Sequence, residues 1–548
     1  MVAFNIREFR GMSQKVAPRS LPEGMAQSAE NVDFGRGSLR PVHDSVASSQ
    51  SVSYGTLTAN TETLYLTSNS NQHLLAFDND VDVVESPIAD DQHDRVYWTG
   101  NTTYPQITSS PYNNIYKLAL DTPSAPSIGL SPSTSANVAS ENPVSRAYVA
   151  TFVTAFGEES KPSPVTPNDI KDVYSDQTIT VTAGAAPATR NYAYIRIYRT
   201  DADGVFRFLH QYSNTSGGSF TDSFADTALQ EEVPSTDWDP PDNDMIGLTS
   251  MANGITAGFF GQTLCFSEAY LPHAWPEEYR LTTAYDIVGL ARMDTGLLVL
   301  TKGKPYMVQG ADPAGLTITE LDVAQSCVAK KSIVEMGPSA IYASPDGLVG
   351  INSTGARVLT DPIFNKFQWD SYNPSDIKGV RWEDRYLAFT DRGGSYPEGF
   401  VFDPRGGMDA FCDINISSDI IASFNYLKTD SVYVLDSSAN LKTWATDSDD
   451  WVPYTYKTKE FFTARPVNFG VCQVAFGDDL DATSTTFKVL AGSNSANSVI
   501  HTETIAASTD VATFRLPSGT KYNVFAVEVV SEREITSIAL AESSSELR

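Results

Sequence analysis

Residues 296–310 read GLLVLTKGKPYMVQG, two apolar runs that flank a Lys-Gly-Lys turn. Short apolar runs on either side of a turn predict a β-hairpin. Further hairpins are expected at residues 258–267, at 340–351, at 385–390 with 399–403, and at 431–436 with 441–444. Successive hairpins lie roughly 40 to 50 residues apart, which is the period of a four-stranded propeller blade. We therefore predict an all-β fold built around a β-propeller, whose radial repetition protects the edges of its small sheets.

The segment before residue 140 continues this pattern. Residues 63–67 and 74–78 predict one hairpin, and residues 95–98 and 115–118 predict further strands. With about four blades visible after residue 251 and one or two before residue 140, we expect a ring of roughly five or six blades.

Two other segments predict sandwich domains. Residues 148–160 (YVATFVTAFGEES) alternate as a strand and end in a Gly-Glu-Glu-Ser turn. They resemble the corresponding strand and turn of fibronectin type III domains, which implies an inserted β-sandwich of about 90 residues. The last hundred or so residues alternate without the propeller period, as in residues 522–530 and 535–540, and predict a C-terminal β-sandwich.

Composition narrows the class of protein. The chain has 548 residues, of which 41% are hydrophobic and 19% charged, and this favours several globular domains over disorder. Its formal charge of −29 repels phosphate and argues against a DNA reader. The same charge is compatible with DNA passing through a channel, because a surface without cationic clamps cannot hold the duplex.

Cysteine spacing and the N-terminus bear on where the protein is made. The four cysteines form no Cys-x-x-Cys pair, which favours reduced buried thiols over a zinc site or a disulfide framework. Arg7 and Glu8 stand where a signal peptide needs its apolar core, and no apolar run approaches a membrane span. We expect synthesis and assembly in a cytosol and no membrane-spanning segment.

The search for catalytic chemistry is unproductive. The sequence contains no Gly-rich phosphate loop, no His-Glu-x-x-His and no Gly-x-Ser-x-Gly, and its six histidines are scattered. The run from Asp201 to Gly204 favours a turn over a calcium loop, since the later ligands of such a loop are missing. We predict no catalytic, metal-binding or cofactor-binding residues, and no cofactor.

An aromatic loop follows one of the strongest hairpins. Residues 266–276 read FSEAYLPHAWP. The favoured interpretation is a blade connection in which Trp275 covers a sheet edge and the prolines stiffen the loop. The alternative is an exposed loop whose Tyr270 and Trp275 contact a neighbouring subunit, as interface aromatics often do.

Residues 9–41 read FRGMSQKVAPRSLPEGMAQSAENVDFGRGSLRP. Residues 31–34 and 39–42 around a Gly-Arg-Gly-Ser turn predict a strand, a turn and a second strand. The order of a Gly-x-Ser-Gln element, a Leu-Pro and an Ala-x-Asn hairpin closing on Leu-x-Pro resembles the start of tail nozzle proteins of short-tailed bacteriophages, also called tail tubular protein B. Met12 departs from this pattern, because a second Gly is usual there. The Ser-Glu-x-x-x-Pro-x-x-Trp-Pro run at residues 267–276 also resembles phage tail propeller proteins.

This resemblance implies a structural virion protein, made in the host cytoplasm. Six copies would form a homohexameric ring below the portal and the tail adaptor protein, pass double-stranded DNA through the lumen and hold tail fibre proteins outside. Without a core of its own, the arm would pack on a neighbouring copy or on the adaptor. The candidate assembly contacts are Phe9, Met12, Leu21, Met25, Val32, Phe34, Leu39, Tyr270 and Trp275.

The domain organisation expected from these patterns has five parts. They are an N-terminal arm and hairpin (1–50), the first part of the propeller (51–140), the inserted sandwich (141–235), the remainder of the propeller (236–450) and the C-terminal sandwich (451–548). Two other functions stay open: a tail protein that binds or depolymerises host glycans, which needs clustered exposed aromatics, and a secreted adhesin, which needs a signal peptide.

Overall fold

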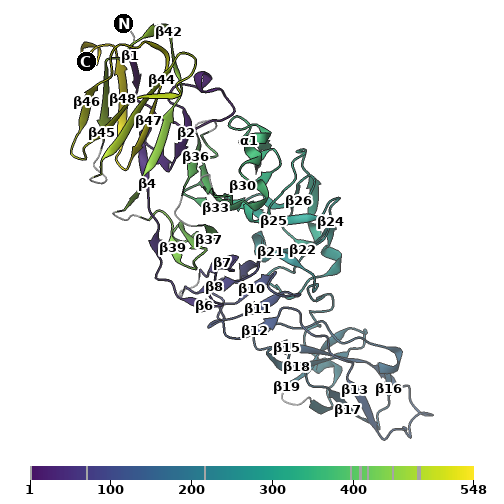
Figure 1. Cartoon of the computed structure of the whole chain (residues 1–548). Coiled ribbons are helices and arrows are strands. Elements are labelled where there is room, and N and C mark those ends of the chain that lie inside the picture. Colours follow the sequence, from purple (N-terminus) through teal and green to yellow (C-terminus); the bar gives the residue numbers. More distant parts are fainter. Residues whose placement is uncertain are drawn as a thin grey trace. The chain divides into compact units, whose positions relative to one another are not determined.

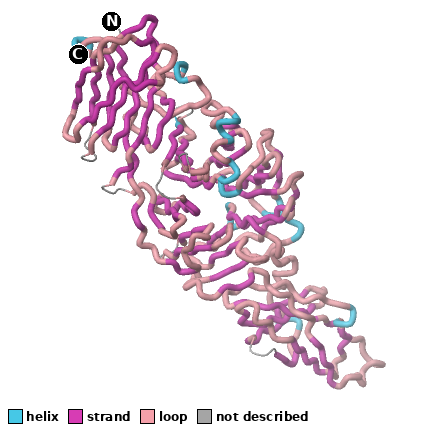
Figure 2. Tube along the Cα trace, viewed as in Figure 1, coloured by secondary structure: helices cyan, strands magenta, loops and turns pink. Residues whose placement is uncertain are grey.

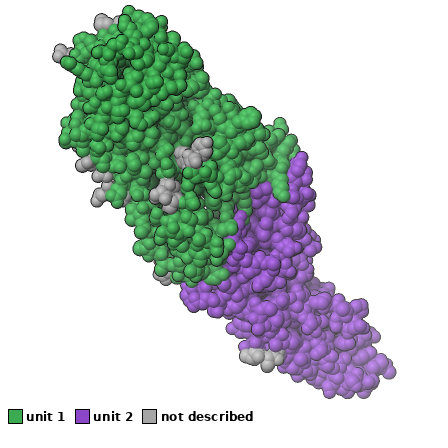
Figure 3. Space-filling view, in the orientation of Figure 1, with its two compact units in different colours: residues 1–78, 291–307, 319–548 green, residues 79–290, 308–318 purple. Residues whose placement is uncertain are grey.

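The computed structural model describes residues 3–68, 72–214, 218–394, 398–406, 410–415, 419–446, 450–477 and 483–547. Within these ranges strands predominate, and the one α-helix, α1 (Lys366–Asp370), has five residues (Figure 2). The predicted fold class is confirmed: the chain is all-β, with the small blade-like sheets of a β-propeller, a fibronectin type III-like sandwich and a C-terminal sandwich. The chain divides into unit 1 (residues 1–78, 291–307 and 319–548) and unit 2 (residues 79–290 and 308–318) (Figure 3).

Four small sheets of propeller type lie in unit 1. Their strands are short and mostly apolar because both faces are covered, as in β30, whose residues 340–344 are all buried. The first sheet has the order β6 (Val52–Tyr54), β8 (Leu74–Phe77) and β7 (Thr63–Leu66), and the second β29 (Val334–Glu335), β30 (Ser339–Ser344), β31 (Gly347–Asn352) and β32 (Gly355–Val358). The third has the order β33 (Lys378–Trp382), β34 (Arg385–Phe389), β35 (Gly399–Phe402) and β36 (Phe411–Ile414). The fourth has the order β37 (Ile420–Tyr426), β38 (Ser431–Asp436), β39 (Leu441–Thr443) and β5 (Val46–Ala47).

Unit 2 holds two such sheets, and residues of a third belong to both units. The first runs β12 (Ile115–Lys117), β11 (Gln106–Thr108), β10 (Val96–Thr99) and β9 (Asp82–Glu85); the second runs β21 (Ile246–Ser250), β22 (Thr256–Phe260), β23 (Thr263–Phe266) and β24 (Leu281–Thr282); the shared sheet runs β25 (Ile287–Met293), β26 (Gly296–Thr301), β27 (Tyr306–Gln309) and β28 (Thr317–Glu320). Counted over the described ranges, the small sheets number seven rather than the expected five or six blades. The expectation fell short because five of them, not four, lie after residue 240.

The hairpins predicted from sequence are confirmed. Strands β22 and β23 pair with Phe260 opposite Thr263, β30 and β31 with Ser344 opposite Gly347, and β7 and β8 with Thr63 opposite Phe77. Strands β34 with β35 and β38 with β39 also pair as expected. The turn of the β7–β8 hairpin includes residues 69–71, which lie outside the described ranges.

The sandwich of unit 2 has two main three-stranded sheets. One contains β13 (Ser127–Ser131), β17 (Thr178–Ala183) and β20 (Gly218–Asp222), and the other β15 (Tyr148–Thr154), β18 (Tyr192–Thr200) and β19 (Phe206–Ser213); β14 (Val144–Arg146) pairs with β16 (Lys171–Val173). Alternate residues of β17, such as Ile179 and Val181, enter a core with Phe152, Ile195 and Ile197. Because β13 belongs to this sandwich, the predicted boundary at residue 141 lies too late.

The C-terminal sandwich also consists of two sheets (Figure 1). One orders β1 (Ala3–Ile6), β48 (Ile535–Ala541), β43 (Val471–Phe476) and β46 (Val511–Arg515); the other contains β2 (Ala26–Glu30), β41 (Tyr454–Thr458), β47 (Tyr522–Ser531), β44 (Thr485–Gly492) and β45 (Ser498–Ile505), with β42 (Phe461–Val467) also on β47. Inward residues of the facing sheets, such as Val474 and Phe487, share one buried core.

Two strands of this sandwich come from the N-terminus, and Figure 1 shows them in purple among the yellow C-terminal strands. Strand β1 pairs with β48, with Phe4 opposite Leu540. Strand β2 pairs with β41 and, through Glu30 opposite Asp413, with β36, so one ten-stranded sheet joins a propeller sheet to the sandwich. The sandwich therefore does not begin at residue 451, as predicted, but draws strands from residues 3–30.

The predicted strand, turn and strand over residues 31–42 are confirmed as β3 (Val32–Asp33) and β4 (Arg40–His43), with Val32 opposite Pro41. Strand β4 continues onto β40 (Trp451–Val452), and β5 completes the sheet of β37, β38 and β39. Gly24 stands at φ +82°, and a Cβ there would lie 2.5 Å from the carbonyl oxygen of Glu8, so this turn requires glycine.

The expectation that other chains supply the core of the arm is wrong. Phe9, Met12 and Leu39 are at most 1% exposed and belong to the same core as the C-terminal strands. The Phe9 ring meets the edge of Tyr456 at 5.5 Å, and the Tyr456 hydroxyl donates to the Gly24 carbonyl oxygen. The sequence hid this because the partners lie more than 400 residues away.

Replacing Phe9 by Ala tests this burial. Phe9→Ala leaves a cavity in the core and should lower the free energy of unfolding by about 3–5 kcal/mol. Phe462→Ala is the matched control, because Phe462 lies on β42 of the same sandwich and is 63% exposed. It should change that free energy by about 0.5 kcal/mol or less. Urea unfolding followed by intrinsic fluorescence measures both, and equal losses would contradict the burial of the arm.

Candidate functional site

The structure separates the nine predicted assembly contacts into three groups. Six are buried inside unit 1 and are closed to any partner of the folded chain: Phe9, Met12, Leu21, Met25, Val32 and Leu39. Phe34 is partly buried against the same core. Tyr270 and Trp275 share a loop of unit 2 but differ in exposure.

The aromatic loop follows the blade-connection interpretation. Trp275 is buried with Val84, Tyr97 and Leu248, and its indole Nε1 donates to the Pro272 carbonyl oxygen at 2.7 Å. It is therefore no surface contact. Tyr270 is 50% exposed and remains the one aromatic of this loop able to meet a partner.

Unit 2 contains a buried ionic cluster that the sequence did not indicate. Glu158 lies in the turn after β15 of the sandwich, and its carboxylate accepts from Arg190 of the same domain and, at 3.4 Å, from Arg95. Arg95 directly precedes β10 and also pairs with Asp91 at 2.7 Å. The side chains of Asp91, Arg95, Glu158 and Arg190 are all less than 10% exposed. The cluster thus links the sandwich to the sheet of β9–β12 inside unit 2.

The cluster keeps Glu158 ionised. Burial acts to raise the pKa of the Glu158 carboxyl, but the positive charges of Arg190 and Arg95 and the neighbouring His273 hold it below its ordinary range. An ion pair in this setting costs desolvation on both sides, and only complete pairing makes it tolerable. Glu159, the next residue, is also buried and accepts from Arg196, Tyr198 and Thr151. Both glutamates of the Gly-Glu-Glu-Ser turn therefore bind side chains of other elements in the interior, and neither is a solvated turn residue.

His273 lies beside this cluster in a state that disfavours protonation. It is buried, and its ring meets Trp238 edge-on at 5.6 Å. Burial, opposed by Glu158 and reinforced by Arg190 and Arg95, lowers the pKa of His273 to about 4. The imidazole is therefore neutral at pH 7.

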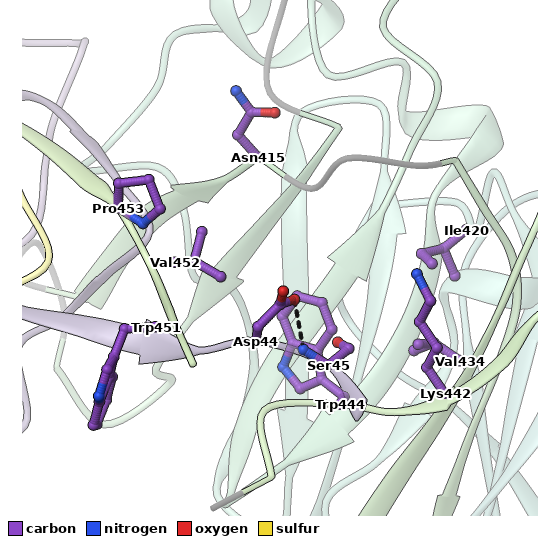
Figure 4. A pocket seen from close by; sticks show the side chains of 10 residues that line it. All are labelled: Asp44, Ser45, Asn415, Ile420, Val434, Lys442, Trp444, Trp451, Val452 and Pro453. Atoms are coloured by element: carbon purple, nitrogen blue, oxygen red, sulfur yellow. Dashed lines mark hydrogen bonds between the residues drawn. The ribbon is translucent and has the colours of Figure 1, made fainter. Parts of the chain in front are cut away.

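A cavity of about 150 Å³ lies in unit 1 between the sheet of β37–β39 and the β4–β40 ladder (Figure 4). Apolar side chains, among them Ile420, Val434 and Val452, form part of its wall. Polar residues also line it: Asp44, Ser45, Asn415, Lys442 and Trp444. The described lining of this cavity thus contains tryptophan together with one acidic and one basic side chain.

Two carboxyls of unit 1 hold protons near neutral pH. Burial raises the pKa of Asp413 to about 7, although Tyr372 donates to it at 2.9 Å and Arg392 lies nearby. Burial and a hydrogen bond with Asp419 raise the pKa of Glu398 to about 7. Neither carboxyl is among the described residues that line the Trp444 cavity. Asp413 instead stands on β36 opposite Glu30 of β2, where it belongs to the core of the fold.

Other sequence expectations have plain outcomes. All four cysteines are free and buried, as predicted. The carboxylate of Asp201 accepts from the backbone N–H groups of Asp203 and Val205 and from Arg207, so the turn interpretation is confirmed. Over the described ranges, no three His, Cys, Asp or Glu side chains are grouped to hold a metal ion. In the same ranges no helix has the length and apolarity of a membrane span.

No protein-family model and no curated protein matches the chain. Similar solved structures include the Pan2 WD40 domain of Neurospora crassa (11% identity, TM-score 0.27, 50% of this chain and 87% of that one) and Hsv2 of Kluyveromyces marxianus (8%, 0.25, 50% and 70%). An exo-β-1,3-galactanase of Phanerochaete chrysosporium, solved with galactose, is also similar (8%, 0.19, 91% and 100%). TM-scores this low carry no argument about function.

Glu158→Gln tests the joint between the sandwich and the β9–β12 sheet. It leaves the buried guanidinium of Arg190 without its anion and removes one of the two carboxylates that Arg95 meets, so it should lower the free energy of unfolding of unit 2 by about 3–5 kcal/mol. Glu277→Gln is the control, since the Glu277–Arg280 pair of the same unit is exposed and should contribute little. Thermal unfolding measures both. Similar melting temperatures for the two variants would count against a structural role for the cluster.

His273 predicts acid sensitivity. Because its pKa of about 4 lies below the ordinary 6.5, the unfolded chain binds this proton more readily, so stability is retained above pH 6.5 and lost as pH falls towards 4. The loss should reach about 3 kcal/mol at most. His273→Phe removes the titration and should flatten melting temperature between pH 7 and 4.5 relative to the parent, whereas His210→Phe should not. Parallel pH profiles for His273→Phe and the parent would contradict this.

Proposed function

We propose that this chain is a structural component of the tail of a short-tailed bacteriophage, a ring-forming nozzle or hub protein. The observation that carries the proposal is the N-terminal pattern, a Gly-x-Ser-Gln element followed by an Ala-x-Asn hairpin, which resembles the start of tail nozzle proteins. The role is mechanical and assigns no reaction to the chain. The protein would be made in the host cytoplasm and reside in the virion.

The residues of this pattern occupy positions on which the fold depends, which supports treating the pattern as more than chance. The Gly11 carbonyl oxygen accepts from Ala26 N–H at 3.1 Å, and Gln14 N–H donates to Ile363 at 3.1 Å. Asn31 adopts φ +58°, and its side-chain oxygen accepts from Asn415 N–H at 2.9 Å. A left-handed backbone at this position favours Asn among residues other than Gly.

Charge supports a channel that does not bind its cargo. One chain carries a formal charge of −29, so a ring of six would carry about −170. Phosphates near such a surface are repelled, and without clusters of Lys and Arg the protein cannot release counterions to hold the duplex. In this proposal double-stranded DNA slides through the lumen without sequence-specific contacts.

The partners follow from the same proposal. Neighbouring copies complete a homohexameric ring, the tail adaptor protein contacts one end and tail fibre proteins contact the outside. The apolar side chains of the arm pack inside the chain, so other surfaces must form the contacts with these partners. Tyr270 keeps an exposed ring and is the predicted contact that stays available.

Native mass spectrometry of the purified full-length protein, alone and mixed with its adaptor, tests the proposal. A closed ring of six copies in either sample is the expected result, together with the chain among the proteins of purified particles. Tyr270→Ala should reduce the fraction of rings, whereas Tyr285→Ala, a comparably exposed tyrosine of unit 2, serves as control. A stable monomer that is absent from virions would overturn the proposal.

A further inference from the structure

The cavity beside Trp444 has the chemistry of a ligand site. Trp444 is only 5% exposed, and among the described residues its indole N–H finds no acceptor. A tryptophan N–H can only donate, and a buried donor left unpaired costs about 1–3 kcal/mol. The Trp444 ring is fixed by edge contacts with Phe389 at 5.5 Å and Trp382 at 6.2 Å, so the donor does not turn away. An occupant with an acceptor would relieve this cost.

The polar lining limits the charge of such an occupant. Asp44 brings a carboxylate, one oxygen of which accepts from Ser45 N–H at 2.6 Å, the bond drawn in Figure 4. Lys442 brings an ammonium group, 3.3 Å from Asp436. An anion would face Asp44 and a cation would face Lys442, whereas an apolar molecule would leave the Trp444 N–H unpaired. The lining therefore favours a neutral molecule that both donates and accepts hydrogen bonds.

Size narrows the class further. An apolar cavity of about 150 Å³ admits one six-membered ring such as benzene, and this cavity has that volume. Hydroxyl groups donate and accept at the same atom, which suits a carboxylate, an indole N–H, an ammonium and the Asn415 amide together. The apolar wall of Ile420, Val434 and Val452 suits the C–H face of such a ring.

We propose that this cavity binds a single neutral sugar ring, with Trp444 donating to a ring hydroxyl and Asp44 accepting from another. The ring is either a free monosaccharide or the end of a glycan. The inference uses only unit 1 of one chain and does not rest on the proposed role in a phage tail. If the protein forms a ring but binds no sugar, only the sugar proposal fails. If it binds a sugar but forms no ring, only the proposed role in a phage tail fails.

Saturation-transfer NMR on the full-length protein tests this with glucose, galactose and N-acetylglucosamine, each as the free sugar and as its methyl glycoside. At least one should bind with a millimolar Kd, and Trp444→Phe should weaken it about fivefold or more by removing one hydrogen-bond donor. Trp369→Phe is the matched control, because Trp369 is a buried tryptophan of unit 1 that belongs to another core cluster and is not among the residues that line the cavity. It should retain binding.

A second variant guards against loss of folding. Asp44 is exposed, so Asp44→Asn should leave the melting temperature unchanged while it weakens binding of the sugar. Binding of the methyl glycoside as well as the free sugar points to a glycan end, and binding of the free sugar alone points to a monosaccharide. The proposal is overturned if none of the sugars binds, if both variants bind like the parent, or if acetate or choline binds more tightly than every sugar.

Discussion

Strand β2 pairs along its length with β41 on one side and, at Glu30 alone, with Asp413 of β36 on the other. Through it a propeller sheet and the C-terminal sandwich become one sheet of ten strands. Backbone groups on the edges of β36 and β41 would otherwise need water or another chain as partners, and open edges invite aggregation. The path of the first 47 residues follows from this constraint, because β1 and β5 each complete a sheet whose other strands come from the C-terminal half, and β4 joins the N-terminal strand β3 to β40.

Unit 2 uses a different means to join its parts. Its sandwich carries Glu158, and the carboxylate meets Arg190 from the same domain and Arg95 from beside β10. A hydrophobic contact of similar area could give as much stability, since buried ions are costly to desolvate. What the ionic cluster adds is geometry: only one placement of Arg95 pairs it with Glu158 and Asp91 at once. His273, neutral beside these charges, makes the same joint respond to acid.

Local patterns in the sequence predicted the strands well and the long-range partners poorly. Hairpins such as 340–351 depend on residues close in the chain, where alternation and a Pro-Asp-Gly turn are sufficient. The role of residues 9–41 could not be read in this way, because Phe9 and Leu39 meet partners from Tyr456 to Ile535. The apolar residues of this segment predict that it needs a core, but no local pattern shows that the same chain supplies that core.

In the candidate site, too, local features could be predicted from the sequence and long-range contacts could not. That Trp275 serves the fold and not a surface contact could be inferred from a loop of eleven residues, and the structure shows it buried. The Glu158 cluster joins residues 32 and 63 positions apart, and acidic residues are so common in this chain that no spacing marks this one as buried. The Trp444 cavity assembles side chains from Asp44 and from residues 415–453, which only the closure of β4 and β5 brings together.

The pairing of β1 with β48 also sets an order of events on the ribosome. Strands β1 and β2 are synthesised long before their partners β48 and β41. Contacts of such long sequence separation form slowly, and domains made earlier can fold meanwhile. The apolar side chains of the N-terminal segment therefore lack their core until β41 and β48 have been made. A chain that stops before β48 therefore cannot present a finished C-terminal sandwich to any partner.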